Sequence, residues 1–271
     1  MCRSVAQGGR RCRGSSLAVR RAKYAIDGSA TARAYKKALD EGEVDYGGAA
    51  HQASQRAQAS AQRAHQAADE GDHDAAARHA LDAKNQMNHA SRLAREHTER
   101  KATRAAYVKR TNKKIDEIVH AVNPHYDPAV QDYSHNCSHV AQTYELRRRG
   151  IEADPAPDTT HGRQVGQIGE AWGGEFTHCD SSKADIGRSD VERAFAEPGS
   201  RGIMAVWWKN GGGHAFTVEN VGGKVRFVDG QPTPAVTDAS HYFSLAKSCA
   251  FMRLDDKPTP SKSALSPFVR Q

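Results

Sequence analysis

The chain has 271 residues, of which 38% are hydrophobic and 26% are charged, and its mean hydropathy is −0.76. This length allows one large domain or two ordinary ones, and the low hydropathy predicts that part of the chain is helical or extended and well solvated. No apolar run approaches the roughly 18 residues of a membrane span, and the opening lacks the apolar stretch of a secretory signal. We therefore expect a protein that is cytoplasmic where it is made.

Positive charge is concentrated in the first half of the chain. Residues 1–130 hold 23 Lys and Arg against 15 Asp and Glu, whereas residues 131–271 hold 16 against 17. A basic half can contact nucleic acid, but aromatic residues for base stacking and a groove-reading motif are missing. A solvated helical face is therefore the favoured interpretation, with nucleic-acid contact as the alternative.

The cysteines are odd in number and scattered, unlike a disulfide framework, so at least one free thiol is expected. They are Cys2, Cys12, Cys137, Cys179 and Cys249. The first two lie in residues 1–28, a basic, glycine-rich opening that we interpret as a flexible arm. No matching Cys or His pair lies near them, so we assign no metal ligand.

Residues 29–122 are predicted to be an alanine-rich helical region. Good helix formers fill 30–42 and 47–69, Gly71 and its acidic neighbours mark a turn, and the helical pattern then continues to about Val122. Large apolar residues are few, so the contact faces are thin and stability depends on pairing along the hairpin or on a partner. This region is typical of an adaptor or a stalk.

Two prolines in residues 123–128 end the helical pattern, and the composition then changes. We predict an α+β domain over residues 123–256, followed by a disordered tail over 257–271. Its expected elements are helices at 137–149 and near 189–196 and strands at 202–209, 214–221 and 224–230. Gly222 and Gly223 can form the tight turn between the last two strands, which pairs position i with about 445 − i.

Cys137 stands at the expected start of a helix, with Ser134 and Asn136 as cap candidates. The N-terminus of a helix beside an imidazole is a typical setting for a nucleophilic cysteine. Taken alone, Cys137 is better explained as a buried structural thiol.

His214 follows three glycines and begins a predicted strand. The pairing across the turn brings it close to Asp229 and Gln231, on the same face of the sheet. An acid in that place would hold the imidazole in one tautomer, the third role in a Cys-His-Asp arrangement. The alternatives are a histidine that is only a satisfied polar residue and an aspartate that serves the following turn. If Asp229 proves neutral, Gln231 or Asp238 is the candidate for the orienting role.

Several sequence blocks resemble the papain-fold toxin domain of the protein-glutamine deamidase type, which occurs at the C-termini of bacterial and bacteriophage toxins and effectors. The blocks are "VNPHYDP", "NCSHVAQTYELRRRGIEADPAP", "PGSRGIMAVWW", "GGHAFTVENVGGKVRFVDGQ" and "YFSLAKSCAFMRL", within about residues 121–254. By position, Cys137 resembles the nucleophile, His214 the base and Asp229 the orienting acid. Gln231 occupies a recurrent position, and Gln131 has the spacing of an oxyanion donor in papain-like enzymes.

The resemblance implies a papain-like fold and a thiol hydrolase that converts a target glutamine to glutamate through a thioester, with no cofactor. It also implies a target protein, an immunity protein as a further partner, and delivery into a target cell or packaging in a phage particle. A cysteine peptidase or a cell-wall amidase would use the same three residues, and a transglutaminase would pass the acyl group to an amine. A non-enzymatic helical adaptor would leave Cys137 inert.

Overall fold

The computed structural model describes residues 16–45, 47–160 and 165–270. The chain divides into two compact units, unit 1 up to Ala105 and unit 2 from Ala106 onward. The helix α4 (His73–Ala121) contributes residues to both units. No helix in these ranges combines the length and apolarity that a membrane crossing requires.

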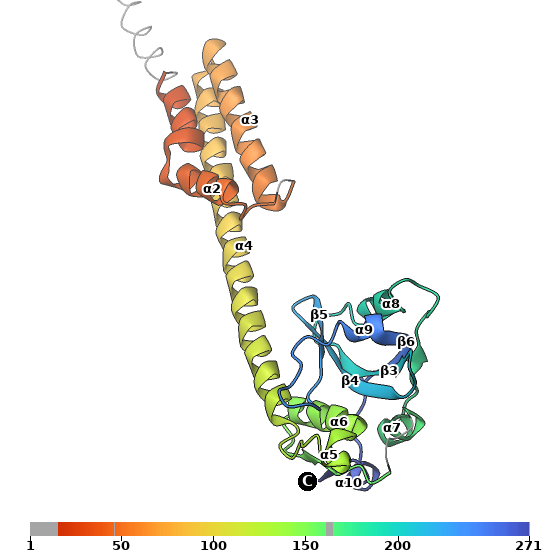
Figure 1. Cartoon of the computed structure of the whole chain (residues 1–271). Helices are drawn as coiled ribbons and strands as arrows, with labels where there is room; N and C mark the ends of the chain where they lie inside the picture. The colour runs from red at the N-terminus through yellow and green to blue at the C-terminus, as the bar shows by residue number, and fades with distance from the viewer. Residues whose placement is uncertain (1–15, 46, 161–164, 271) are drawn as a thin grey trace, which may run out of the picture. The chain divides into compact units, whose positions relative to one another are not determined.

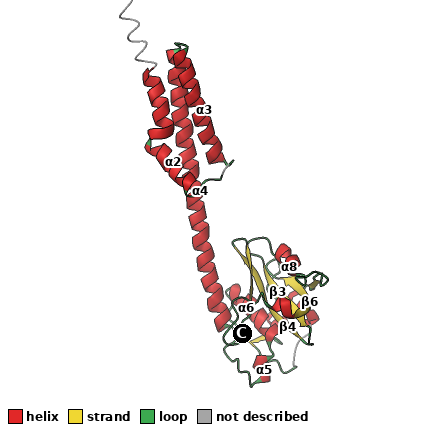
Figure 2. Ribbon diagram, turned by 45° about the horizontal axis from the view of Figure 1, so that its top comes forward, coloured by secondary structure: helices red, strands yellow, loops and turns green. Residues whose placement is uncertain are grey.

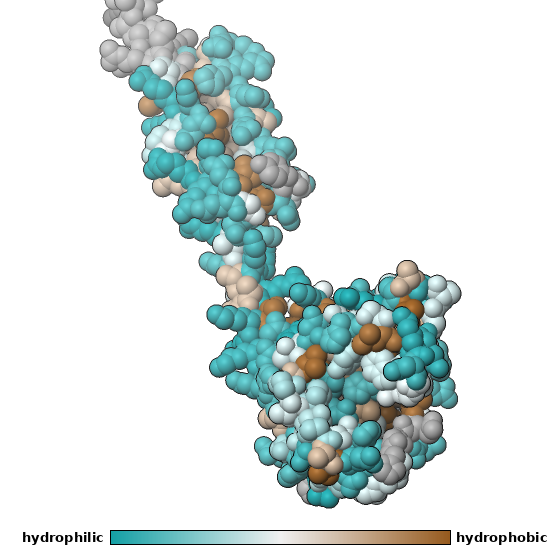
Figure 3. All heavy atoms as spheres, in the orientation of Figure 1, coloured by the Kyte–Doolittle hydropathy of each residue, from teal (hydrophilic) through white to brown (hydrophobic). Residues whose placement is uncertain are grey.

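The described part of unit 1 consists of helices (Figures 1 and 2). These helices pack mainly through alanine side chains. Residues 16–23 are helical, and the elements that follow are η1 (Tyr24–Gly28), α2 (Ala30–Asp40), α3 (Ala49–Asp69) and the first part of α4. Ser29 caps α2 by accepting a hydrogen bond from the Ala32 N–H at 3.0 Å. On the face visible in Figure 3, the surface of these helices is mostly hydrophilic, with scattered apolar side chains.

The expectation of a flexible arm over residues 1–28 is wrong for residues 16–28, while residues 1–15, with Cys2 and Cys12, lie outside the described residues. Ala18, Ala22 and Ala25 recur at helical spacing and are buried. Ala22 packs against alanines of α3 and α4, so this segment completes the alanine core of unit 1. The larger residues Leu17 and Tyr24 are exposed and the buried positions carry only alanine, which concealed that pattern.

Unit 2 is built on an antiparallel five-stranded sheet in the order β2-β6-β3-β4-β5. The strands are β2 (Thr177–His178), β3 (Arg201–Trp208), β4 (Gly213–Val221), β5 (Lys224–Val228) and β6 (Ala246–Arg253). A separate pair is formed by β1 (Asp154–Pro155) and β7 (Val269–Arg270). The helices are α5 (Gln131–Ser134), α6 (Cys137–Arg148), α7 (Val165–Trp172), α8 (Arg188–Ala194), α9 (Tyr242–Leu245) and α10 (Lys262–Leu265).

Two apolar clusters fill the space on the two sides of this sheet. In Figure 1, α6 and α7 lie on one side of β3 and β4, and α8 and α9 lie on the other. The first cluster joins residues of α6, α7 and α10 to the sheet, with Leu146, Ile168 and Ile203 fully buried. The second cluster is richer in aromatic residues and includes Phe195 and Phe216. The expected α+β order of helix first and sheet second is confirmed.

The end of α4 belongs to unit 2 rather than to the alanine-packed helices. Ile115, Val119 and Val122 are buried in a cluster with Tyr144 of α6 and Val228 of β5. The expected start at residue 123 rested on the proline-bounded break, whereas the compact unit begins at Ala106. Backbone breaks mark where a helix ends, and packing decides to which core its last turns belong.

The expectation of a disordered tail over residues 257–271 is also wrong. Leu265, Phe268 and Val269 are buried in the cluster beside α6 and α7. The Ala156 N–H donates to the Phe268 carbonyl at 2.9 Å, alongside the β1–β7 pair. Three apolar side chains in a polar, proline-containing stretch are enough to anchor it to the core.

Candidate active site

Cys137 is the first residue of α6, and its side chain is partly buried against the cluster between α6 and α7. Asn136 occupies the N-cap position, but its side chain makes no capping hydrogen bond to the helix. Ser134, the other cap candidate, is the last residue of α5. Cys137 therefore lies at the end of the helix where the first backbone N–H groups have no acceptor within the helix.

His214 and Asp229 are brought together by the hairpin of β4 and β5. The pairs run from Thr217–Val228 to Val221–Lys224, so each pair of numbers adds to 445 as the turn at Gly222 and Gly223 predicts. Beyond the Thr217–Val228 pair, at the end of the hairpin away from the turn, His214 Nε2 lies 2.8 Å from Asp229 Oδ2. The Cys137 thiol lies near enough to the imidazole to raise the pKa of His214. Because Nε2 faces the carboxylate, the other ring nitrogen is the one available to sulfur.

Asp229 is held by three further contacts. The Gln231 N–H donates to Oδ1 at 2.9 Å, and the Tyr242 hydroxyl donates to Oδ2 at 2.9 Å. The Asp229 backbone exchanges two hydrogen bonds with Val236. Burial, with the charge of Asp229, raises the pKa of Tyr242, so the phenol stays a neutral donor. Asp229 is only 2% exposed and its carboxylate has a single orientation.

Aromatic rings enclose the imidazole. Trp208 and Phe216 lie nearly parallel to the His214 ring at centroid distances of 6.0 and 6.1 Å, and Tyr242 meets it edge-on at 5.5 Å. These rings limit water access to the pair of His214 and Asp229. Exclusion of water strengthens a charged hydrogen bond.

The charge state of His214 follows from these neighbours. Burial favours the neutral imidazole and lowers the pKa, but hydrogen bonds and charge interactions with Asp229 and Cys137 outweigh it. The outcome is a pKa raised from 6.5 to about 10. At neutral pH the ring is therefore protonated.

A pocket of about 640 Å³ opens beside this group. His214, Asp229, Gln231 and Tyr242 line its inner part, and Trp208 and Leu245 provide apolar surface toward the opening. Leu245 is 54% exposed. The pocket can admit an amino-acid side chain to the imidazole.

Residues 128–232 match the model of a protein family described as papain fold toxin 1, glutamine deamidase. This segment is similar to papain-fold toxin domains, and we refer to it below as the toxin domain. No curated protein and no solved structure matches the chain. The toxin domain lies inside the 121–254 segment whose blocks carry the resemblance, and it contains Cys137, His214 and Asp229. The mixed helix and antiparallel sheet of unit 2 agree with the papain-like fold of this family.

The other residues predicted for the site of the toxin domain have different places. Gln231 lines the pocket, and Asn136 is fully buried behind Cys137. Gln131 begins α5 with an exposed side chain. Asp238 accepts a hydrogen bond from the Ser240 N–H at 3.0 Å and lines a separate depression next to Arg226, so it is not the partner of His214.

Three residues at the site were not predicted from the sequence. Trp208 and Tyr242 contact His214, and Asn123 contacts the segments that carry Cys137 and Asp229. The paired tryptophans in "AVWWK" and the tyrosine of "YFSLAK" were visible as aromatic residues within the blocks of the toxin family. Asn123 lies in the block "VNPHYDP", but its residue type gave no signal beyond its place before a proline.

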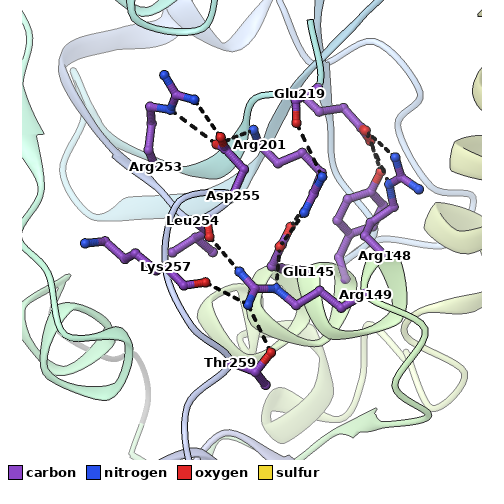
Figure 4. A network of polar contacts seen from close by, with 12 residues as sticks. Glu145, Arg148, Arg149, Arg201, Glu219, Arg253, Leu254, Asp255, Lys257 and Thr259 are labelled. Carbon is purple, nitrogen blue, oxygen red and sulfur yellow. Dashed lines mark hydrogen bonds and ion pairs between the residues drawn. The ribbon is translucent and has the colours of Figure 1, made fainter. Parts of the chain in front are cut away.

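A buried carboxylate joins the helix of Cys137 to the strand of His214 (Figure 4). Glu219, on β4 and 2% exposed, accepts a hydrogen bond from Arg148 Nη2 of α6 at 2.9 Å and another from the Tyr144 hydroxyl. Burial and Glu219 raise the pKa of Tyr144. These contacts fix the C-terminal half of α6 against Glu219 of β4.

A second buried carboxylate joins the same helix to β3 and to the C-terminal segment. Glu145 accepts hydrogen bonds from Arg149 Nε at 2.7 Å and from Arg201 Nε at 3.1 Å. Arg149 also donates to the carbonyls of Leu254 at 2.6 Å and Lys257 at 3.0 Å. Figure 4 shows both carboxylates between α6 and the sheet. The position of Cys137 is therefore set by ionic contacts as well as by apolar packing.

Among the described residues, no group of three or more His, Cys, Asp or Glu side chains is placed to hold a metal ion. The toxin domain brings a cysteine, a histidine and an aspartate side chain together in one place.

Proposed function

We propose that the protein deamidates a glutamine side chain of a target protein, with Cys137 as nucleophile, His214 as general acid and base, and Asp229 as the residue that orients His214. The contacts that join these three side chains inside a domain of the glutamine deamidase family support this assignment. The proposal also includes action on a protein inside a target cell and an immunity protein that covers the pocket.

In the first step, the Cys137 thiolate attacks the amide carbon of the substrate glutamine, and a carbon–sulfur bond forms. The negative charge moves to the former carbonyl oxygen, which the Cys137 backbone N–H at the start of α6 can stabilise. We assign Gln131, exposed at the start of α5, as the second donor. The carbon–nitrogen bond then breaks as the His214 imidazolium gives its proton to the leaving ammonia.

In the second step, neutral His214 removes a proton from a water molecule that attacks the thioester. The carbon–sulfur bond breaks, glutamate is released, and the thiolate and imidazolium return to their starting state. Asp229 stabilises the imidazolium before the reaction and again after glutamate is released, because its Oδ2 remains hydrogen-bonded to His214 Nε2. The reaction consumes one water and yields one ammonia for each glutamine.

The test is a screen of cell proteins incubated with the full chain, read by intact mass and by released ammonia. We expect one protein to gain about one mass unit at one glutamine and ammonia to appear in equal amount. The matched control is Cys137→Ala, which should produce neither. Peptide fragments without ammonia would replace this proposal with a peptidase, and incorporation of a labelled amine would replace it with a transglutaminase.

A further inference from the structure

Asn123 is a buried polar residue that the proposed reaction does not use. It lies two residues beyond the end of α4, is 4% exposed, and precedes the segment that matches the toxin family. A buried amide is retained in a core only when its hydrogen bonds are satisfied, so its partners show which parts of the chain it holds.

The partners of Asn123 belong to the two segments that carry the proposed catalytic residues. Its Nδ2 donates to the Gln231 carbonyl at 2.8 Å and to the Tyr133 carbonyl at 3.2 Å. The Asn123 and Asn136 amides also face each other, with both nitrogen–oxygen distances at 3.4 Å. One side chain thus bridges the segment before Cys137 and the segment after Asp229.

These bonds close a ring of contacts. Asn136 precedes Cys137, the Cys137 thiol contacts His214, and His214 contacts Asp229. The Gln231 N–H donates to Asp229, and the Gln231 carbonyl accepts from Asn123, which returns the ring to Asn136. A displacement on one side of the ring is therefore opposed by the other side.

The backbone around Asn123 is itself held tightly against this ring. Val119 and Val122 are buried in the cluster with Val228. A Cβ on Gly230, which lies between Asp229 and Gln231, would overlap Val122 and come within 3.0 Å of the Val119 carbonyl. The end of α4 is in direct contact with the loop of Asp229, which leaves Asn123 no room to move away.

We propose that Asn123 is a positioning residue that sets the distance between the Cys137 and Asp229 segments and thereby the alignment of thiol and imidazole. The inference rests on the proposed function for its catalytic consequence, but its geometric consequence can be measured without activity. It also makes the last residues of α4 part of the active unit, although they lie outside the family match.

The test compares Asn123→Ala with Asn220→Ala in the full chain. Asn220 is also buried at 2% exposure. Its amide donates to the carbonyls of Phe195 and Ala196 and accepts from the Gly223 N–H, so it has no hydrogen bond to a residue of the ring. Both variants should lower the melting temperature. Only Asn123→Ala should lower kcat, by about 10²-fold with KM nearly unchanged, since small misplacements of reacting groups cost rate rather than binding.

The second readout is the pKa of His214, followed by NMR of the ring. Asp229 and Cys137 both raise that pKa, so misalignment should lower it in Asn123→Ala and leave it unchanged in Asn220→Ala. If Asn123→Ala fails to fold, Asn123→Asp takes its place. It keeps the shape of the side chain but replaces the amide donor with an acceptor, and kcat and the pKa of His214 are measured on it instead. Equal kcat and an equal His214 pKa in the two asparagine variants would overturn the inference. A wild-type chain without deamidase activity would instead refute the proposed function, with the NMR comparison still deciding the positioning role.

Discussion

The cores of units 1 and 2 are built from different kinds of side chain. The buried clusters of unit 1 are mostly alanine, with Tyr35, Val44 and Met87 as the larger members. The clusters of unit 2 contain phenylalanine, tryptophan, methionine and leucine. Alanine lets helices approach closely but buries little area for each residue, so unit 1 needs long helices where unit 2 needs only short elements.

The two units differ more sharply in their buried polar groups. In the described part of unit 1, the buried polar residues are the serines Ser54, Ser60 and Ser91. Unit 2 buries amides, carboxylates and imidazoles, among them Asn123, His139, Glu145, Glu219 and Asp229. Fully satisfied polar networks fix side chains in one arrangement, which catalysis requires and helix packing does not. The contrast predicts that activity depends on unit 2 alone.

The largest effect is expected at the nucleophile. Cys137→Ala should lower kcat by about 10⁴-fold or more, because no other thiol takes its place, while the thermal unfolding of unit 2 stays nearly unchanged. His214→Ala should lose nearly as much, and Asp229→Asn about 10²-fold, since it removes only orientation and charge. Ammonia release under saturating substrate measures all three. Full activity in Cys137→Ala would refute the assignment.

Truncation distinguishes the two possible starts of the active unit. Residues 106–271 alone should fold and keep the kcat of the full chain, because they retain the last turns of α4. A chain of residues 128–271 should not fold, since it lacks Ile115, Val119 and Val122. Near-UV circular dichroism and ammonia release provide the readouts. A folded, active 128–271 chain would contradict the role given to α4.

Removal of the buried carboxylate between α6 and β4 should destabilise unit 2. Glu219→Ala leaves Arg148 and Tyr144 without their partner, and breaking a buried ion pair on one side costs about 3–5 kcal/mol. The control is Glu197→Ala, because the Glu197 side chain is 78% exposed and its contact with Arg253 is 3.9 Å long. That change should stay within about 0.5 kcal/mol. Urea unfolding measures both, and equal midpoints would show that the ionic contacts do not hold α6.

The smallest effect concerns pH. The pKa of His214 is raised in the folded state, so its contacts stabilise the protein fully below its unfolded value of 6.5 and lose that contribution as pH rises to about 10. The difference in free energy of unfolding between wild type and His214→Gln should therefore shrink across this window. Urea unfolding at several pH values measures it. A difference that grows with pH would mean that the ring is neutral in the native state.

Local sequence patterns predicted most elements of the toxin domain. The glycine pair at 222–223 determined the register that places His214 beside Asp229, and a cap-like segment placed Cys137 at a helix start. The helix α7 was missed because Gly166 and Gly169 interrupt its pattern, although Ile168 and Trp172 are buried one turn apart. Strand β6 was missed because its apolar and polar residues do not alternate regularly along the sequence, and its burial is equally irregular.

The contacts that complete the site could not be predicted in the same way. Asn123 reaches Gln231 across 108 positions in the sequence, and Arg148 reaches Glu219 across 71. Such pairs depend on the packing of whole elements, and neither residue type nor spacing along the chain indicates them. Residues 16–28 and the C-terminal segment were misjudged for a related reason, because a few small or isolated apolar residues anchor each of them.

The central claim is that Cys137 and His214 exchange a glutamine amide for a carboxylate with oxygen from water. The most direct measurement is the reaction of an identified substrate in ¹⁸O-labelled water, followed by peptide mass spectrometry. The account predicts a gain of about three mass units at one glutamine side chain with the peptide backbone intact, because one labelled oxygen replaces the amide nitrogen. Labelled oxygen at a new peptide C-terminus, with the glutamine unchanged, would contradict it.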